Sequence, residues 1–247
     1  MTPPLFLLPD LSGAVVGADV ELSGPEARHA ATVKRLRVGE QILLSDGRGR
    51  RAVAEIALLE RDRLTLRVLS VADEPEPAVR FVVVQALPKG ERADLAVEIL
   101  TELGADEIVP WSAARSVSQW RDADKAGKGV AKWRRTAAEA AKQSRRARIP
   151  VVADLAGTAA IAERIRTAAL GLVLHEDADE PLAAVTFPSQ GDVLVVVGPE
   201  GGIADEELAA LAEAGGRSVR LGTEVMRTST AGAAALSVLS VATGRWR

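Results

Sequence analysis

Two segments in the C-terminal half of the chain combine glycines with charged side chains in an order that suits ligand binding. The apolar run Val193–Val197 leads directly into Gly198-Pro199-Glu200-Gly201-Gly202. Glycines in such a turn let backbone N–H and C=O groups approach a ligand closely. The second segment, Leu221–Ala231, places Arg227 just before a cluster of hydroxyl side chains. Together they indicate a ligand site formed largely by backbone groups, with an arginine at its edge.

Both segments also have a structural interpretation. The glycines could simply turn the chain into a helix whose N-cap is Asp205, and Ser229 or Thr230 could cap the helix after the second segment. A third segment, Leu174-His175-Glu176, is a weak signal by itself. Function is favoured at the glycine turn because ligands of parallel sheets gather outside the carboxyl ends of the strands.

Several other chemistries require motifs that the sequence does not contain. It has no phosphate loop of the G-x-x-x-x-G-K-[ST] type, no G-x-G-x-x-G dinucleotide motif and no G-x-S-x-G nucleophile elbow. It also has no cysteine, and its two histidines, His29 and His175, fall in different expected domains. The acidic run 176–180 lacks the glycine and distal glutamate of an EF-hand loop. We therefore expect no metal site and no thiolate catalysis.

Positive charge is concentrated in one part of the chain. The net charge is −3, but residues 121–148 contain ten Lys or Arg against three acids, so this segment carries +7 and the rest carries −10. Such asymmetry suits a polyanion, because Lys and Arg displace condensed counterions from phosphates. A solvated helix face explains the same charges about equally well.

The elements that must position these residues fall into two regions. Residues 1–72 predict a small β-barrel with one helical segment, Pro25–Leu36. Its strands are expected at Asp19–Leu22, Gln41–Ser45, Arg51–Ile56 and Arg63–Leu69. Residues 73–79 hold two prolines among acids and predict a linker.

From residue 80 onward, strands alternate with helices, which is typical of an α/β domain with a mostly parallel sheet. The expected strands are Phe81–Ala86, Glu107–Val109, Leu170–Leu174, Val193–Val197 and Ser218–Leu221, and the expected helices are Arg92–Leu103, Val130–Ser144, Thr158–Ala168, Asp205–Ala214 and Ala231–Thr243. No signal peptide and no apolar run of roughly 18 residues is evident, so we expect a cytoplasmic protein without membrane contact.

Many of these segments resemble, in the same order, those of the RsmE-type ribosomal RNA uridine-N3 methyltransferases, which are SPOUT enzymes. The resemblance covers nearly the whole chain. It rests on Lys89–Arg92, Thr101–Gly104, Ile108–Pro110, Arg115–Val117, Trp133, Glu139–Ala141, Gln143-Ser144, Arg148–Pro150, Gly198–Gly202, Leu221-Gly222, Met226–Thr228, and, near the N-terminus, the His29 segment with Arg35–Gly39.

The resemblance implies a fold, a cofactor and an assembly. The fold would be an α/β domain (80–247) with a C-terminal trefoil knot, joined by the linker to an N-terminal PUA-like barrel (1–72). The cofactor would be S-adenosylmethionine, and the protein would be a homodimer. The residues that the resemblance assigns to the cofactor are Leu174, His175, Glu176, Gly198, Pro199, Glu200, Gly201, Gly202, Leu221, Gly222, Val225 and Met226.

The implied substrate is N3 of a uridine in small-subunit (16S) ribosomal RNA, within an assembled or nearly assembled subunit. We interpret Arg227 as stabilising negative charge on the uracil oxygens, and Glu200 as orienting the base or taking its proton. RNA contacts are expected from Arg28, His29, Lys34, Arg35, Arg37, Arg134, Arg135, Gln143, Arg145, Arg146 and Arg148.

Two departures from the family pattern leave alternatives open. Ser229 stands where the family commonly has Glu, and Arg145 replaces the glycine usual after Gln143-Ser144. A ribose 2′-O RNA methyltransferase of the same superfamily is the nearest alternative. A non-catalytic, RNA-binding ribosome assembly factor is the other, and Ser229 is its main support.

Overall fold

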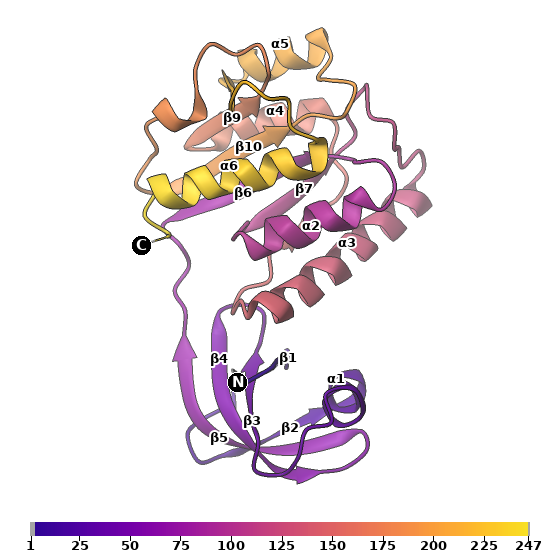
Figure 1. Ribbon diagram of the computed structural model, residues 1–247, viewed down its shortest axis with the longest axis vertical. Helices are drawn as coiled ribbons and strands as arrows, with labels where there is room; N and C mark the ends of the chain where they lie inside the picture. The colour runs from indigo at the N-terminus through magenta and orange to yellow at the C-terminus, as the bar shows by residue number, and fades with distance from the viewer. Residues whose placement is uncertain (1–2, 247) are drawn as a thin grey trace. The chain divides into compact units, whose positions relative to one another are not determined.

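The computed structural model describes residues 3–246 and divides the chain into two compact units (Figure 1). The N-terminal unit comprises residues up to 76 together with 141–149, and the C-terminal unit comprises 77–140 and the residues from 150 onward. The expected division did not assign 141–149 to the N-terminal unit. Nothing local in the sequence signals this, because the segment includes the end of a long helix.

The N-terminal unit is built on a five-stranded sheet with the order β1-β3-β4-β5-β2. Its strands are β1 (Leu5–Leu7), β2 (Asp19–Ser23), β3 (Gln41–Ser45), β4 (Arg50–Leu59) and β5 (Arg63–Asp73). Alternate apolar residues such as Ile42, Leu44, Leu64 and Leu66 are fully buried, which gives the sheet one core face. The short β1 was not expected as a strand, since three residues are too few to show alternation.

The helical segment of this unit is shorter than expected. It consists of α1 (Gly24–Arg28) followed directly by a π-helical turn, His29–Val33. The prediction that it continues to Leu36 is wrong. Arg35 has a φ of +54°, a left-handed conformation that a right-handed helix cannot accommodate.

The C-terminal unit is built on a six-stranded sheet with the order β11-β9-β10-β6-β7-β8, in which every neighbouring pair is parallel. Its strands are β6 (Val79–Ala86), β7 (Glu107–Trp111), β8 (Val151–Val152), β9 (Leu170–Leu174), β10 (Gly191–Val197) and β11 (Arg217–Val219). The expected α/β class with a parallel sheet is therefore confirmed. The carboxyl ends of the strands meet along one edge of the sheet.

Helices cover both faces of this sheet. They are α2 (Arg92–Glu102), α3 (Ala123–Ser144), α4 (Thr158–Thr167), α5 (Asp205–Glu213) and α6 (Thr228–Ala242), with a short 3-10 helix at Leu182–Ala184. In Figure 1, α2 and α6 lie side by side on one face, and Val82 and Val84 pack on the other face in a core that includes Ile161 and Leu211 of α4 and α5. Among residues 3–246, no helix is long and apolar enough to cross a membrane.

Two helices, α3 and α6, begin earlier than the sequence pattern indicated, whereas α5 begins at Asp205 as expected. The helix α3 starts at Ala123, because Asp122 Oδ1 accepts a hydrogen bond from Lys125 N (2.8 Å) and caps it. Asp205 lies inside α5, whose N-cap is Ala204, and α6 begins at Thr228 after Arg227. The N-cap predictions for Asp205, Ser229 and Thr230 are therefore wrong, and the hydroxyl cluster forms the first turn of α6.

The backbone conformation at position 145 explains why a glycine, rather than an arginine, is usual there. The backbone of Arg145 has a φ of +56°, and Arg146 N donates to Ala141 O (2.9 Å) while Arg145 N donates to Lys142 O (3.2 Å). This is a Schellman motif, in which the residue after the helix adopts the left-handed conformation and is usually glycine.

We expect Arg145→Gly to stabilise the N-terminal unit by about 1 kcal/mol, because glycine adopts this conformation without the steric cost of a side chain. Thermal unfolding followed by circular dichroism should show the midpoint of that unit rising by a few degrees. Arg145→Ala removes the same charge but keeps a Cβ, so it is the control and should not raise the midpoint. An equal rise in both variants would instead assign the effect to charge.

Candidate functional site

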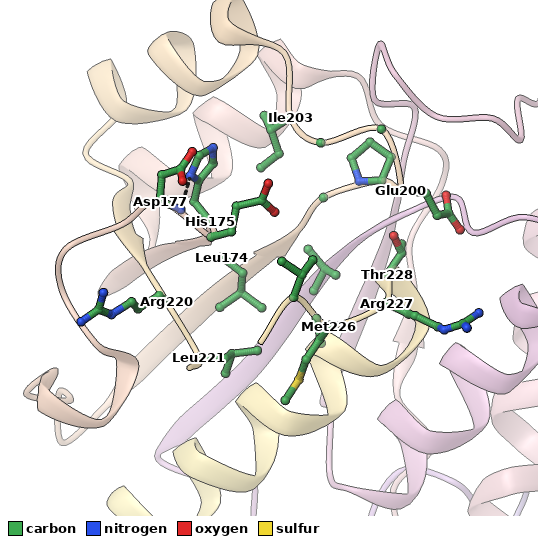
Figure 2. Close-up of a pocket in the computed structure, with 18 of the residues that line it drawn as sticks. Leu174, His175, Asp177, Glu200, Ile203, Arg220, Leu221, Met226, Arg227 and Thr228 are labelled. Carbon is green, nitrogen blue, oxygen red and sulfur yellow. Dashed lines mark hydrogen bonds between the residues drawn. The ribbon is translucent and has the colours of Figure 1, made fainter. Parts of the chain in front are cut away.

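A cavity of about 760 Å³ opens at the carboxyl ends of β9, β10 and β11. Figure 2 shows side chains from three chain segments turned around it. Its lining includes every residue expected at the cofactor site: Leu174, His175, Glu176, Gly198, Pro199, Glu200, Gly201, Gly202, Leu221, Gly222, Val225 and Met226. Arg227 lines the same cavity. The sheet thus brings together three segments that are separated in sequence.

Strand pairing accounts for this convergence. The strands β10 and β11 both pair with β9, so the segments that follow all three emerge at the same edge. Backbone hydrogen bonds then join the segments beyond the strands. His175 N donates to Val219 O (3.0 Å), and Leu182 N donates to Arg220 O (2.8 Å).

The glycine turn after β10 is closely packed. A Cβ added to Gly201 would lie 2.9 Å from the backbone oxygen of Arg115, and one added to Gly198 would lie 2.8 Å from Ile203 Cγ1. Gly202 has a φ of +74°, and its N–H donates to Pro199 O (3.0 Å). Space and backbone conformation therefore both require glycine in this turn.

Several charged residues of the pocket were not expected as site residues. Arg115, from the loop after β7, lines the cavity and donates to Ile203 O (3.4 Å), although the sequence singled it out only as part of a family resemblance. The carboxylates in the lining are Glu176, Asp177, Glu200, Asp205 and Glu224, and the guanidinium groups are Arg115, Arg220 and Arg227. Acidic groups thus outnumber basic ones, which suits a ligand that carries positive charge.

The two ends of the pocket differ in chemistry. Figure 2 shows His175 and Asp177 at one end, where Asp177 N donates to His175 Nδ1 (3.2 Å), and Glu200 and Arg227 at the opposite end. Val225 and Met226 are 75% and 44% exposed, so they present apolar surface at the pocket. Among the described residues, no group of three or more His, Asp or Glu is placed to hold a metal ion.

The carboxyl end of β6 fixes the Glu200 and Arg227 end of the pocket. Gln85 is 1% exposed, and its Nε2 donates to Thr228 O (3.1 Å), the residue after Arg227. A few residues further on, Lys89 N donates to Glu200 Oε1 (3.2 Å). The sequence signal for Gln85 was its amide in an otherwise apolar strand end, but its partner lies in a distant helix.

Glu207 holds the glycine turn from the other side. Its carboxylate is buried and accepts hydrogen bonds from Thr158 Oγ1 (2.7 Å), Ala114 N (3.0 Å) and Ala204 N (3.3 Å). A buried carboxylate is tolerated when such donors satisfy it. The start of α5 is thereby tied to the loop that carries Arg115.

The residues expected to contact RNA are divided between the two units. In the N-terminal unit, Arg28, Lys34, Arg35, Arg37, Gln143 and Arg145 are exposed. His29 is half-buried and forms a T-shaped contact with the Phe6 ring, with 6.0 Å between the ring centroids. Arg148 donates to Glu74 O (2.7 Å), so these two side chains also support the fold. Arg146 is half-buried in the same unit. In the C-terminal unit Arg134 pairs with Asp154 (3.1 Å), and Arg135 is exposed.

Local acids offset much of the positive charge of residues 121–148. At least six of the ten basic side chains lie within 4 Å of a carboxylate: Lys125, Lys128, Lys132, Arg134, Lys142 and Arg148. Lys142 is buried and pairs with the half-buried Glu26, so it supports the fold rather than an exposed surface. The exposed pairs are weak and leave their charges accessible, but the segment is less positive than its sequence suggests.

Comparison with known proteins places this geometry in a family. An RNA methyltransferase domain family matches residues 74–240, and an RNA methyltransferase PUA domain family matches residues 22–69. The ribosomal RNA small subunit methyltransferase E of Mycobacterium bovis is 47% identical over 97% of this chain and 90% of its own length.

Two solved structures cover almost the whole fold. The ribosomal RNA small subunit methyltransferase E of Neisseria gonorrhoeae, bound to S-adenosyl methionine, has a TM-score of 0.87 at 29% identity, over 97% of this chain and 98% of that one. A Legionella pneumophila methyltransferase in complex with the same cofactor has a TM-score of 0.86 at 29% identity, over 98% of each chain. By its matched domains, its sequence identity and its fold, this chain belongs to the ribosomal RNA small subunit methyltransferase E family.

Proposed function

We propose that this protein transfers the methyl group of S-adenosylmethionine to N3 of a uridine in small-subunit ribosomal RNA. The observation that carries the proposal is the pocket at the ends of β9, β10 and β11, which gathers the twelve residues expected at the cofactor site in a chain of this family. The two solved relatives described above contain this cofactor.

The pocket fits such a cofactor in size and charge. Its volume of about 760 Å³ is in the range of small-molecule sites. The excess of carboxylates suits the positively charged sulfonium and ammonium groups, and the exposed Val225 and Met226 offer apolar surface for a ring. When bound, S-adenosylmethionine supplies a methyl group on a positively charged sulfur.

The residues of this chain then align the uracil base and manage its charge. Arg227 is exposed at the pocket edge and can donate to a uracil oxygen as the ring loses its N3 proton. Glu200 lies at the same end and is the carboxylate that we assign to orienting the base or accepting that proton. Ser229 is 3% exposed in the first turn of α6, so its hydroxyl does not replace a carboxylate in the pocket.

We further propose that the enzyme is a cytoplasmic homodimer and acts on an assembled or nearly assembled small subunit. Exposed basic residues in both units, such as Arg35 and Arg135, supply phosphate contacts that hold the RNA. Sedimentation equilibrium tests the assembly: a mass near twice that of the 25.9 kDa chain supports it, and a monomeric mass contradicts it.

The activity is tested with labelled S-adenosylmethionine and small ribosomal subunits that lack the modification. After transfer, the RNA is digested and the labelled nucleoside is identified by mass spectrometry. We expect 3-methyluridine. A 2′-O-methylated nucleoside would replace the proposal with ribose methylation, and binding of cofactor and RNA without transfer would favour a non-catalytic assembly factor.

A further inference from the structure

The loop after β6 and the first residue of α2 carry two cations, Lys89 and Arg92, that the reaction described above does not use. Lys89 and Arg92 are both exposed, and neither side chain has a hydrogen-bond or ion-pair partner in the described part of the chain. Most other basic residues of this unit are paired, for example Arg80 with Asp192 (3.1 Å), Lys132 with Asp94 (2.7 Å) and Arg164 with Glu107 (2.8 Å). Two neighbouring cations without partners therefore stand out.

This loop lies against the end of the pocket where the target base must enter. Lys89 N donates to Glu200 Oε1 (3.2 Å), and Gln85, at the end of the same strand, binds the carbonyl of Thr228 beside Arg227. Arg227 itself has no ion-pair partner among the described residues. Three free cations thus belong to segments that hydrogen bonds hold together around one carboxylate.

The position of Arg92 is unfavourable for the helix that it begins. It is the first residue of α2, where the helix macrodipole favours acids and disfavours cations. Asp94, the acid in the first turn of α2, forms an ion pair with Lys132 (2.7 Å) instead. A cation kept at a locally unfavourable position, with no partner to compensate, points to a role outside the fold.

We propose that Lys89 and Arg92 bind the backbone phosphates on either side of the target uridine, next to Arg227. This inference rests on the proposed function. When the uracil occupies the Glu200 and Arg227 end of the pocket, the phosphates of its own nucleotide and of its neighbour remain outside the mouth, where Lys and Arg can bind them. The hydrogen bond from Lys89 N to Glu200 also connects this phosphate site to the residue that orients the base.

The test compares Lys89→Ala/Arg92→Ala with Arg61→Ala/Arg166→Ala, which removes the same charge at exposed positions outside the pocket. Affinity for small subunits lacking the modification is measured over a range of salt concentrations, with methyl transfer and cofactor affinity measured in parallel. For the first variant we expect RNA affinity to fall about tenfold or more, and the slope of log affinity against log salt to decrease by about 1 for each phosphate lost. Cofactor affinity should be unchanged.

The outcomes separate this inference from the function on which it rests. If the unaltered enzyme forms 3-methyluridine but the two variants bind RNA with the same affinity and salt slope, the phosphate site is wrong and the function stands. If the unaltered enzyme transfers no methyl group to the RNA, both fall. Lys89→Arg/Arg92→Lys retains both charges and should restore most of the affinity, whereas a loss caused by misfolding would also lower cofactor affinity and the unfolding midpoint.

Discussion

Replacing Arg227 with alanine is expected to lower the rate of methyl transfer by about a hundred- to a thousandfold, the usual loss when one preorganised donor to developing negative charge is removed. Arg227 is exposed and has no ion-pair partner among residues 3–246, so the replacement removes no contact that the fold needs. Cofactor affinity and the unfolding midpoint should therefore stay close to those of the unaltered protein.

The measurement is single-turnover methyl transfer on RNA-saturated enzyme, together with calorimetric titration of S-adenosylmethionine. Arg227→Lys is the matched variant: it keeps the charge but loses the planar fork of donors, so it should recover only part of the rate. A large loss of cofactor affinity in Arg227→Ala, with a normal rate once the cofactor is saturating, would assign Arg227 to cofactor binding instead.

The centre of this site could be predicted from the sequence because its signals are local. A buried strand that runs straight into Gly198–Gly202 marks a strand end where the backbone must turn tightly, and the structure places that turn in the pocket. The segments Leu174–Glu176 and Leu221–Met226 line the same pocket, although Leu174–Glu176 was a weak signal by itself. Which strands lie next to each other is not a local property, so the convergence of the three segments came from the family resemblance.

The residues that support the site could not be identified in this way. Gln85 and Glu207 act through partners more than forty residues away, Thr228 and Thr158. Arg115 lies on a loop that reaches the pocket only because β7 is in the same sheet. Hydrophobic periodicity identifies which face of an element is buried, but it does not show which polar groups meet there.

The free charge of the basic segment 121–148 could not be predicted from the sequence either, for the same reason. Its +7 was counted from the sequence, but the acids Glu26, Asp94 and Asp154, which pair with Lys142, Lys132 and Arg134, lie outside it. Conversely, Lys89 and Arg92 lie outside the segment, and their side chains have no partner among residues 3–246. The distribution of unpaired cations therefore depends on the fold, and counting along the chain misses part of the RNA-binding surface that we propose. A trefoil knot is likewise a property of the chain path, which no local pattern contains.

Gly201→Ala is expected to weaken S-adenosylmethionine binding by about tenfold or more. The added Cβ would lie 2.9 Å from the backbone oxygen of Arg115 and 3.1 Å from its Cβ. Neither atom is the end of a flexible side chain, so the glycine turn and the loop after β7 must move apart. Overpacking of this kind costs about 1–3 kcal/mol, and about 1.4 kcal/mol corresponds to tenfold in affinity.

Gly222→Ala provides the matched control, because Gly222 lines the same pocket but has room for a side chain. Its nearest neighbour, Glu224 Oε2, would lie 3.5 Å from the new Cβ and can rotate away. Calorimetric titration should therefore show a large loss of affinity for Gly201→Ala and at most a small one for Gly222→Ala. Equal affinities in the two variants would mean that the cofactor does not depend on the packing of the glycine turn against Arg115, and a loss confined to Gly222→Ala would place its principal contacts on the segment after β11. The expected difference follows from backbone packing alone, so it tests the location of the cofactor site without relying on any assignment of catalytic roles.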